Sequence, residues 1–195
     1  MPLAPIPGGP GAAPGRPADA GRLGSARVDV LLPADRIRAR VEELGREITR
    51  DYEGQLLVVV GVLKGALVFL ADLMRAIDLP IALDFVGLSS YVGKDSTGRI
   101  ELTSDLGRPI EGLHVLLVED IVDTGLTMRW LVDRLAERRP ASVAICALLE
   151  KPARHRVTVP IRYRGFEIAD EFVVGYGLDW DGRLRNLPYV GVVRG

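Results

Sequence analysis

The sequence predicts an α/β protein with a mainly parallel, twisted sheet flanked by helices. Three short apolar runs, at residues 56–63, 115–118 and 142–149, have the continuous hydrophobicity of strands that are buried on both faces. Segments with helical spacing lie between the runs, and polar residues follow them directly. At 195 residues and 48% hydrophobic composition, the chain has room for one ordinary domain with a sizeable core.

The spacing of apolar residues predicts the successive helices and strands. Ile37, Val41, Leu44 and Ile48 recur every three or four residues, which predicts one apolar face of a helix ending near Gly54. The elements predicted after it are a strand at 56–63, a helix at 66–77, a strand at 81–91, a polar loop at 92–105, a strand at 115–118, a helix through about residue 138 and a strand at 142–149. This alternation places ligands at the carboxyl ends of the strands.

The first 26 residues differ from the rest of the chain. Residues 1–26 are rich in Pro, Gly and Ala, so we expect a disordered tail before a single domain at residues 27–195. The tail lacks a basic start followed by an apolar stretch, which argues against a signal peptide. Lys64 interrupts the most hydrophobic window of the chain, so a membrane span is not predicted. We expect a soluble, cytoplasmic protein that does not bind membranes.

Charge and the few reactive side chains exclude several classes of function. The 25 Lys and Arg residues nearly balance the 26 Asp and Glu residues, so the chain has no overall basic field for nucleic acid. The single cysteine, Cys146, lies inside an apolar run and is expected to be a buried strand residue rather than a nucleophile. His114 and His155 lack metal-ligand spacing and are expected on the surface.

The most informative stretch follows the strand predicted at 115–118. Glu119 and Asp120 come directly after the strand, where two carboxylates are costly unless they are solvated or hold a cation. A turn rich in Asp, Thr and Gly then opens a helix, whose first amides favour an anion. A metal site and a phosphate site are therefore predicted side by side. Helix capping by Asp123 is the alternative, but it would explain only one residue of the cluster.

This stretch also carries a resemblance to a known family. It resembles the phosphoribosyl pyrophosphate signature of the type I phosphoribosyltransferases, in the form typical of the hypoxanthine-guanine branch. Three further stretches match in the family's order, and the resemblance extends from about Pro33 to the C-terminus. The four matching stretches are Leu63-Lys64-Gly65, Glu119-Asp120-Ile121-Val122-Asp123-Thr124-Gly125-Leu126-Thr127, Leu149-Glu150-Lys151 and Phe172-Val173-Val174-Gly175-Tyr176-Gly177-Leu178-Asp179.

The resemblance implies a fold and a reaction. The fold would be the type I phosphoribosyltransferase fold, with a small hood formed by the C-terminal segment. The reaction would transfer the phosphoribosyl group of phosphoribosyl pyrophosphate to hypoxanthine or guanine, with magnesium as cofactor. The sequence departs from many relatives at Ala66 and Leu126, but neither position supplies an essential side-chain group.

The resemblance also implies roles around the ribose and the phosphates. Glu119 and Asp120 would face the ribose hydroxyls and a magnesium ion, for which two carboxylates plus substrate oxygens suffice. Asp123 would exchange a proton with the purine at N7 as general base or acid. The amides and hydroxyls that would cradle the 5-phosphate belong to Asp123, Thr124, Gly125, Leu126 and Thr127.

For pyrophosphate, the resemblance implies backbone amides of Lys64 and Gly65, often with a cis peptide bond at the lysine. Arg185 matches the arginine that binds pyrophosphate oxygens, and Arg183 is a rival for this role. Asp179 would help to hold a second magnesium ion. The pair that would close over the reacting atoms and exclude water is Ser90 and Tyr91.

The base pocket is implied by three residues. The Lys151 ammonium has only donors, which suit the O6 carbonyl of a 6-oxopurine and not the amino group of adenine. Phe172 would stack on the base, although an aromatic residue beside two valines is more often a core residue. The backbone of Val173 would read the N1 and N2 edge.

Two rival functions remain open, together with the assembly state. The first is a relative that prefers xanthine, and the second is a regulator that keeps this fold and binds RNA. Balanced charge argues against the regulator. Members of the family form dimers or tetramers, so a homo-oligomer is expected.

Overall fold

The computed structural model describes residues 27–90 and 100–194, together with the backbone but not the side chains of Ser89 and Ser90. The expected disordered tail at 1–26 and the expected loop residue Tyr91 lie outside the described residues. Within the described ranges, no helix is both long enough and apolar enough to cross a membrane.

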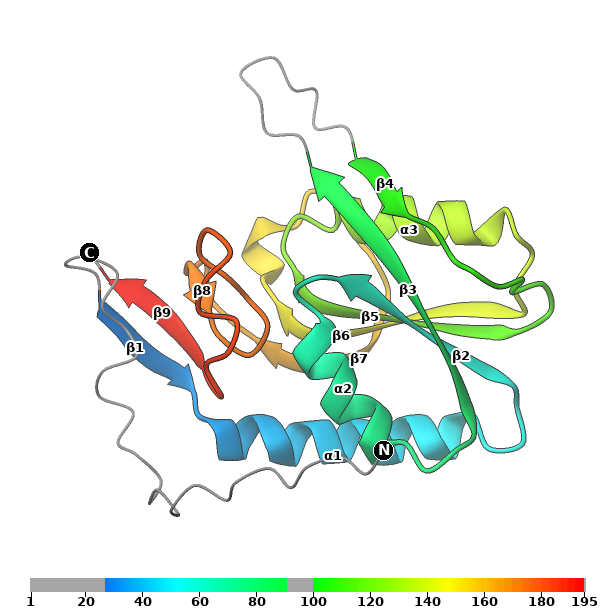
Figure 1. Ribbon diagram of the computed structural model, residues 1–195, viewed down its shortest axis with the longest axis horizontal. Coiled ribbons are helices and arrows are strands. Elements are labelled where there is room, and N and C mark those ends of the chain that lie inside the picture. Colours follow the sequence, from blue (N-terminus) through cyan, green and yellow to red (C-terminus); the bar gives the residue numbers. More distant parts are fainter. Residues whose placement is uncertain (1–26, 91–99, 195) are drawn as a thin grey trace, which may run out of the picture.

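A six-stranded sheet forms the centre of the domain, in the order β4-β3-β2-β5-β6-β7 (Figure 1). Five of these strands are parallel, and β4 pairs antiparallel with β3 at one edge. The elements of this part of the chain are α1 (Ala34–Asp51), β2 (Leu57–Leu63), α2 (Leu67–Ala76), β3 (Ile81–Ser90), β4 (Ile100–Ser104), β5 (His114–Val122), α3 (Leu126–Ala136), β6 (Ser142–Glu150), the 3-10 helix η1 (Pro152–Arg154) and β7 (Ile161–Glu167).

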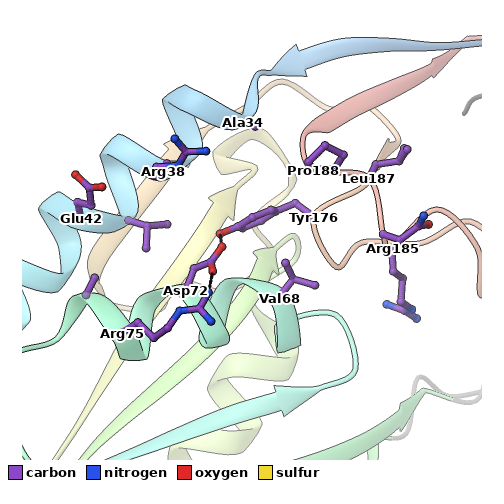
Figure 2. A pocket seen from close by; sticks show the side chains of 13 residues that line it. Ala34, Arg38, Glu42, Val68, Asp72, Arg75, Tyr176, Arg185, Leu187 and Pro188 are labelled. Atoms are coloured by element: carbon purple, nitrogen blue, oxygen red, sulfur yellow. Dashed lines mark hydrogen bonds and ion pairs between the residues drawn. The ribbon is translucent and has the colours of Figure 1, made fainter. Parts of the chain in front are cut away.

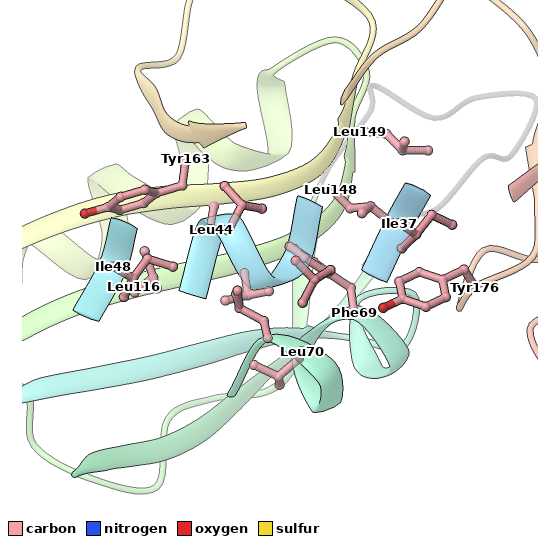
Figure 3. Close-up of a cluster of buried hydrophobic side chains, with 14 of the residues drawn as sticks. Ile37, Leu44, Ile48, Phe69, Leu70, Leu116, Leu148, Leu149, Tyr163 and Tyr176 are labelled. Atoms are coloured by element: carbon pink, nitrogen blue, oxygen red, sulfur yellow. The ribbon is translucent and has the colours of Figure 1, made fainter. Parts of the chain in front are cut away.

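Alternate residues of the central strands build two separate cores. Val59, Leu116 and Leu148 face one side of the sheet, where they pack with the buried faces of α1 and α2 (Figure 3). Val60 and Leu117 face the other side, where α3 covers them. Because both faces of these strands are covered, their sequences are apolar throughout, as the runs of the sequence indicated.

A three-stranded sheet beside the central sheet forms the hood, in the order β1-β9-β8. Figure 1 shows these strands grouped at one side of the domain. The strands are β1 (Arg27–Leu32), β8 (Val173–Val174) and β9 (Val190–Arg194). The C-terminal hood expected from the sequence is therefore present, and it takes an additional strand from the start of the domain.

Three sequence-based expectations are corrected. The polar loop predicted at 92–105 contains β4, because Ile100 and Leu102 alternate with polar residues and Leu102 packs against the second core. The strand predicted at 115–118 runs on to Val122, because Glu119 and Ile121 keep their pairing with β6. Glu119 and Asp120 therefore lie within the strand rather than after it.

The two histidines are partly buried, so their expected surface placement is wrong. The His114 Nδ1 atom lies 2.8 Å from the hydroxyl of Ser142 on the neighbouring strand, and its ring meets Tyr52 edge-on. The His155 side chain is 19% exposed and lies against Glu150. The prediction for Cys146 is confirmed: it is fully buried on β6, and burial raises the pKa of its thiol.

Candidate active site

The parallel strands bring the predicted site residues to one edge of the sheet. β2 pairs in parallel with both β3 and β5, and β5 pairs in parallel with β6, so the carboxyl ends of all four strands lie together. The segments that leave this edge begin at Lys64, Asp123 and Lys151. The amide of Lys151 donates to the carbonyl of Val122 over 3.0 Å, which joins two of these exits directly.

Glu119 and Asp120 form a compact carboxylate pair near this edge. Glu119 is only 8% exposed, and its burial together with the adjacent Asp120 carboxylate raises its pKa well above the ordinary range. The Asp120 carboxylate accepts the amide of Ile121 over 2.8 Å. A cation would relieve both the burial of Glu119 and the repulsion between the two charges, so the pair fits a metal ion.

Gly65 lies against the same carboxylate. A Cβ atom placed on Gly65 would collide with the Asp120 side chain, so the backbone after β2 closely approaches the acid of β5. The Leu63–Lys64 peptide bond just before it is cis. Among the described residues, no group of three His, Cys, Asp or Glu side chains converges to hold a metal. A magnesium ion at this pair would therefore need oxygens from substrate or water.

The turn from Asp123 to Gly125 leads into α3 and lines a small pocket. Gly125 has φ +80°, and a Cβ atom there would lie 2.5 Å from the carbonyl oxygen of Val157, so the position requires glycine. The first helical bond is donated by Arg129 to Gly125, which leaves the amides before it outside the helical pattern. A small cavity of about 80 Å³ is lined by Glu119, Ile121, Val122, Asp123, Thr124, Gly125, Thr127 and Met128.

Asp123 does not cap α3. Gly125 occupies the N-cap position, and no side chain makes a capping hydrogen bond there. The Asp123 carboxylate instead accepts the Arg154 Nε–H over 3.0 Å. The capping alternative left open by the sequence is therefore wrong for this residue.

Lys151 is largely buried, whereas Phe172 is exposed to solvent. The Lys151 side chain is 10% exposed, and its Nζ lies 3.6 Å from the Asp170 carboxylate. Phe172 is 56% exposed and meets Trp180 edge-on, so the alternative of a core residue is wrong. Val173 is buried in β8, where it pairs with β9.

Arg185, predicted to bind pyrophosphate with Arg183 as its rival, is held by two partners in the structure. Its guanidinium donates to the carbonyl of Gly177 over 2.6 Å and pairs with Asp179 at 2.5 Å. Asp179 also accepts the amide of Gly182 over 2.7 Å. Arg183, two residues earlier, is exposed. Asp179 does not join Glu119 and Asp120 in one cluster.

A larger cavity of about 610 Å³ lies between α1, α2 and the hood (Figure 2). Only one of the predicted site residues, Arg185, lines it. Figure 2 shows the Tyr176 hydroxyl directed at Asp72, to which it donates over 2.6 Å. Glu119, Asp120 and Lys151 do not line this cavity. The volume of a cavity alone therefore does not identify the candidate active site.

Two charged neighbours of the site were missed by the reading of the sequence. Arg154 on η1 pairs with both Asp123 and Asp170, and Asp170 also pairs with Lys151. A signal was present for Arg154, because it stands three residues after Lys151 in a turn opened by proline. Asp170 has no comparable local signal, since its partners are 16 and 19 positions away. The side chain of Ser90 and all of Tyr91 lie outside the described residues.

Comparison with known proteins identifies the family. The profile of the phosphoribosyl transferase domain matches residues 28–181. This chain belongs to the phosphoribosyl transferase family. Within this family, it is 50% identical over 170 residues to the hypoxanthine phosphoribosyltransferase of Haemophilus influenzae, covering 85% of this chain and 95% of that protein.

Two further members of the phosphoribosyl transferase family extend the comparison. The hypoxanthine-guanine phosphoribosyltransferase of Mycobacterium avium is 48% identical over 171 residues, with 84% of each chain covered. The crystal structure of a hypoxanthine phosphoribosyltransferase from Staphylococcus aureus superposes with a TM-score of 0.81 at 44% identity, covering 85% of this chain and 91% of that one. The type I phosphoribosyltransferase fold predicted from the sequence is confirmed.

Proposed function

We propose that this enzyme transfers the 5-phosphoribosyl group of phosphoribosyl pyrophosphate to N9 of a 6-oxopurine and releases pyrophosphate. Hypoxanthine would give IMP and guanine would give GMP, which is a reaction of purine salvage. The observation that carries the proposal is the edge where Glu119, Asp120 and Asp123 meet a glycine turn at the start of α3. The names of its relatives support the choice of base.

In this proposal the start of α3 binds the 5-phosphate. The backbone from Asp123 to Thr127 offers amides outside the helical pattern, and the two threonine hydroxyls lie in the same turn. Leu126 contributes its amide only, because its side chain is 41% exposed and apolar. An anion at a helix start gains from these donors and from the helix dipole.

Glu119 and Asp120 would hold the ribose hydroxyls and a magnesium ion. Magnesium, when bound, supplies positive charge that stabilises the departing pyrophosphate. Lys64 and Gly65 would offer backbone amides to that pyrophosphate, and Arg185 its guanidinium. Asp179 would help to bind a second magnesium ion. The Asp179 oxygen that now pairs with Arg185 would then have to leave that ion pair.

Base recognition would use both the sheet edge and the hood. Lys151 would donate to O6, the exposed face of Phe172 would stack on the ring, and the Val173 backbone would read the far edge. Asp123 would accept the proton that leaves the purine as N9 is glycosylated, and return it in the reverse direction. Ser90 and Tyr91 would close over the reacting atoms.

The proposal is tested by mixing the protein with phosphoribosyl pyrophosphate, magnesium and one base at a time. We expect nucleotide and pyrophosphate from hypoxanthine and guanine and none from adenine, because the Lys151 ammonium cannot accept from an amino group. Turnover on xanthine above both would assign the enzyme to a xanthine-preferring type. No turnover on any 6-oxopurine would contradict the proposal.

Assembly and location are proposed on the same family grounds. We propose a homo-oligomer, either a dimer or a tetramer, that acts in the cytoplasm and binds no nucleic acid or membrane. The nearly balanced charge of the chain supports the absence of nucleic acid. Sedimentation of the full chain at several concentrations would test the assembly.

A further inference from the structure

Four side chains of alternating charge run across the site in one chain of contacts. The Lys151 ammonium lies 3.6 Å from one oxygen of Asp170, and the Arg154 guanidinium lies 3.4 Å from the other. Arg154 then reaches Asp123 over 3.0 Å. The two inner members, Asp170 and Arg154, have no role in the proposed reaction, while the outer two would bind the base and move its proton.

Exposure distinguishes the members of this chain. The side chains of Asp123, Arg154 and Asp170 are 39%, 46% and 51% exposed, whereas Lys151 is only 10% exposed. An ammonium that is largely removed from water needs a counter-charge. Lys151 is therefore the member that depends most on the charge of Asp170. Arg154 and Asp123 remain accessible to water, which solvates their charges.

The geometry allows Asp170 to orient the Lys151 ammonium while leaving N–H donors available for a ligand. Lys151 has three N–H donors, and a separation of 3.6 Å from Asp170 is longer than a normal hydrogen bond. At least two donors stay free for a ligand. An ion pair with a half-exposed partner is also weak enough to adjust when a ligand arrives.

Asp170 is itself held in place by the backbone around it. The amide of Ile168 donates to the carbonyl of Glu150 over 2.9 Å, and the amide of Glu171 donates to Ala169 over 2.8 Å. Asp170 therefore stands between the end of β7 and the start of β8, and it connects the segment that carries Phe172 to the edge that carries Lys151.

We propose that Asp170 is a positioning residue for recognition of the 6-oxo group. It holds the Lys151 ammonium directed at the purine O6 and, through Arg154, steadies Asp123 on the other side of the base. This inference rests on the proposed function, and it adds a residue through which the hood segment sets the affinity for the base.

The test compares Asp170→Asn with the wild-type enzyme and with Glu111→Gln. Asn keeps the shape and removes the charge, so the KM for hypoxanthine should rise about fivefold, near the upper limit for a partly exposed ion pair. The KM for phosphoribosyl pyrophosphate should not change, and Asp170→Glu should restore most of the affinity. Glu111 is a matched control, because it forms an exposed 2.9 Å pair with Arg139 near the opposite end of β5.

A second measurement separates positioning from a general effect on the pocket. Unsubstituted purine has no O6, so its inhibition constant should be the same in Asp170→Asn and the wild type. In a Lys151→Met background, Asp170→Asn should cause no further loss of GMP affinity by calorimetry. The inference would be overturned by an unchanged KM for hypoxanthine in Asp170→Asn, or by an equal loss of affinity for unsubstituted purine. It would also be overturned if the losses of GMP affinity caused by Lys151→Met and Asp170→Asn were additive. Absence of IMP formation by the wild-type enzyme would instead overturn the proposed function.

Discussion

Asp123 is placed at a turn where a carboxylate could either cap a helix or accept a proton. The structure excludes the capping role, because Gly125 is the N-cap of α3 and the Asp123 carboxylate accepts a hydrogen bond from Arg154. Asn can still accept the same hydrogen bond while losing the charge and the basicity. Substitution by Asn therefore isolates the proton-accepting role.

We predict that Asp123→Asn lowers turnover at least about tenfold, because general bases contribute roughly 100-fold to 10,000-fold. Binding of phosphoribosyl pyrophosphate should change little, since the neighbouring amides and hydroxyls are unaltered. Steady-state kinetics with each substrate varied would measure both. A variant with wild-type turnover and an unchanged pH profile would refute the role.

The Glu119 and Asp120 pair is expected to serve function at the expense of stability. Because the pKa of Glu119 is raised by burial and by Asp120, the folded state binds its proton more tightly than the unfolded state does. Stability from this group is thus full at acid pH and is lost as the pH rises through the raised pKa. Above that raised pKa, keeping the buried Glu119 carboxylate ionised costs folding free energy.

We predict that the double variant Glu119→Gln with Asp120→Asn loses activity and keeps the fold. Without magnesium, its melting temperature at neutral pH should equal or exceed that of the wild type, and the difference should shrink toward pH 4, near the ordinary pKa of a glutamate. Thermal unfolding from pH 4 to 8 and turnover would be measured. Full activity in the double variant would rule out the assignment.

The sequence identified these residues because they lie consecutively along one strand and turn. Glu119, Asp120 and Asp123 are neighbours in the chain, so their convergence needed no tertiary information. The Asp170 contacts could not be predicted in this way, because Lys151 and Asp170 meet only after β7 has joined the sheet beside β6. A pairing that depends on how a later strand folds back leaves no local pattern.

At the scale of elements, the exit of β2 and the acid of β5 are fitted together. Gly65 faces Asp120, and its φ is not in the left-handed region, so the requirement for glycine comes from space alone. Gly107 is a matched control: a Cβ atom there would meet nothing closer than an Asp84 oxygen at 4.0 Å.

We predict that Gly65→Ala lowers turnover by about 100-fold, because a displacement of the Asp120 carboxylate by an ångström is enough for such a loss. Gly107→Ala should retain activity and change stability by no more than about 0.5 kcal/mol. Kinetics and thermal unfolding of both variants would be compared. Equal activities in the two variants would show that the close approach of Gly65 is not functional.

The elements themselves were predictable where their apolar patterns are long. β2, β5 and β6 are buried on both faces, so their continuous apolar sequences predict strands. β4, β8 and β9 escaped because each has at most five residues, and β1 pairs with a segment at the other end of the chain. Their formation depends on partners that no local window contains.

At the scale of the molecule, the hood joins both ends of the domain. β1 pairs antiparallel with β9 from Arg27 to Leu32, and β9 pairs with β8, which carries Val173. Leu32 is buried in the main core. The start of the domain therefore supports the segment proposed to bind the base.

Two truncations test this dependence. Residues 1–26 are rich in Pro, Gly and Ala, so they offer too little apolar burial to offset ordering, and their deletion should leave turnover and melting temperature unchanged. Deletion of residues 1–32 also removes β1. Loss of the buried Leu32 alone costs about 1.5 to 3 kcal/mol, and each kcal/mol lowers the melting temperature by roughly 2 to 4 °C in a domain of this size.

The longer truncation should therefore melt at least about 3 °C lower and raise the KM for the purine more than that for phosphoribosyl pyrophosphate. This difference is expected because Phe172 and Val173 depend on the hood sheet, whereas the turn at Gly125, which is proposed to bind the 5-phosphate, follows β5 of the central sheet. Thermal unfolding and kinetics with each substrate varied would measure both effects. A large loss on deletion of residues 1–26 would reveal a contribution of that segment, and equal behaviour of the two truncations would show that β1 does not support base binding.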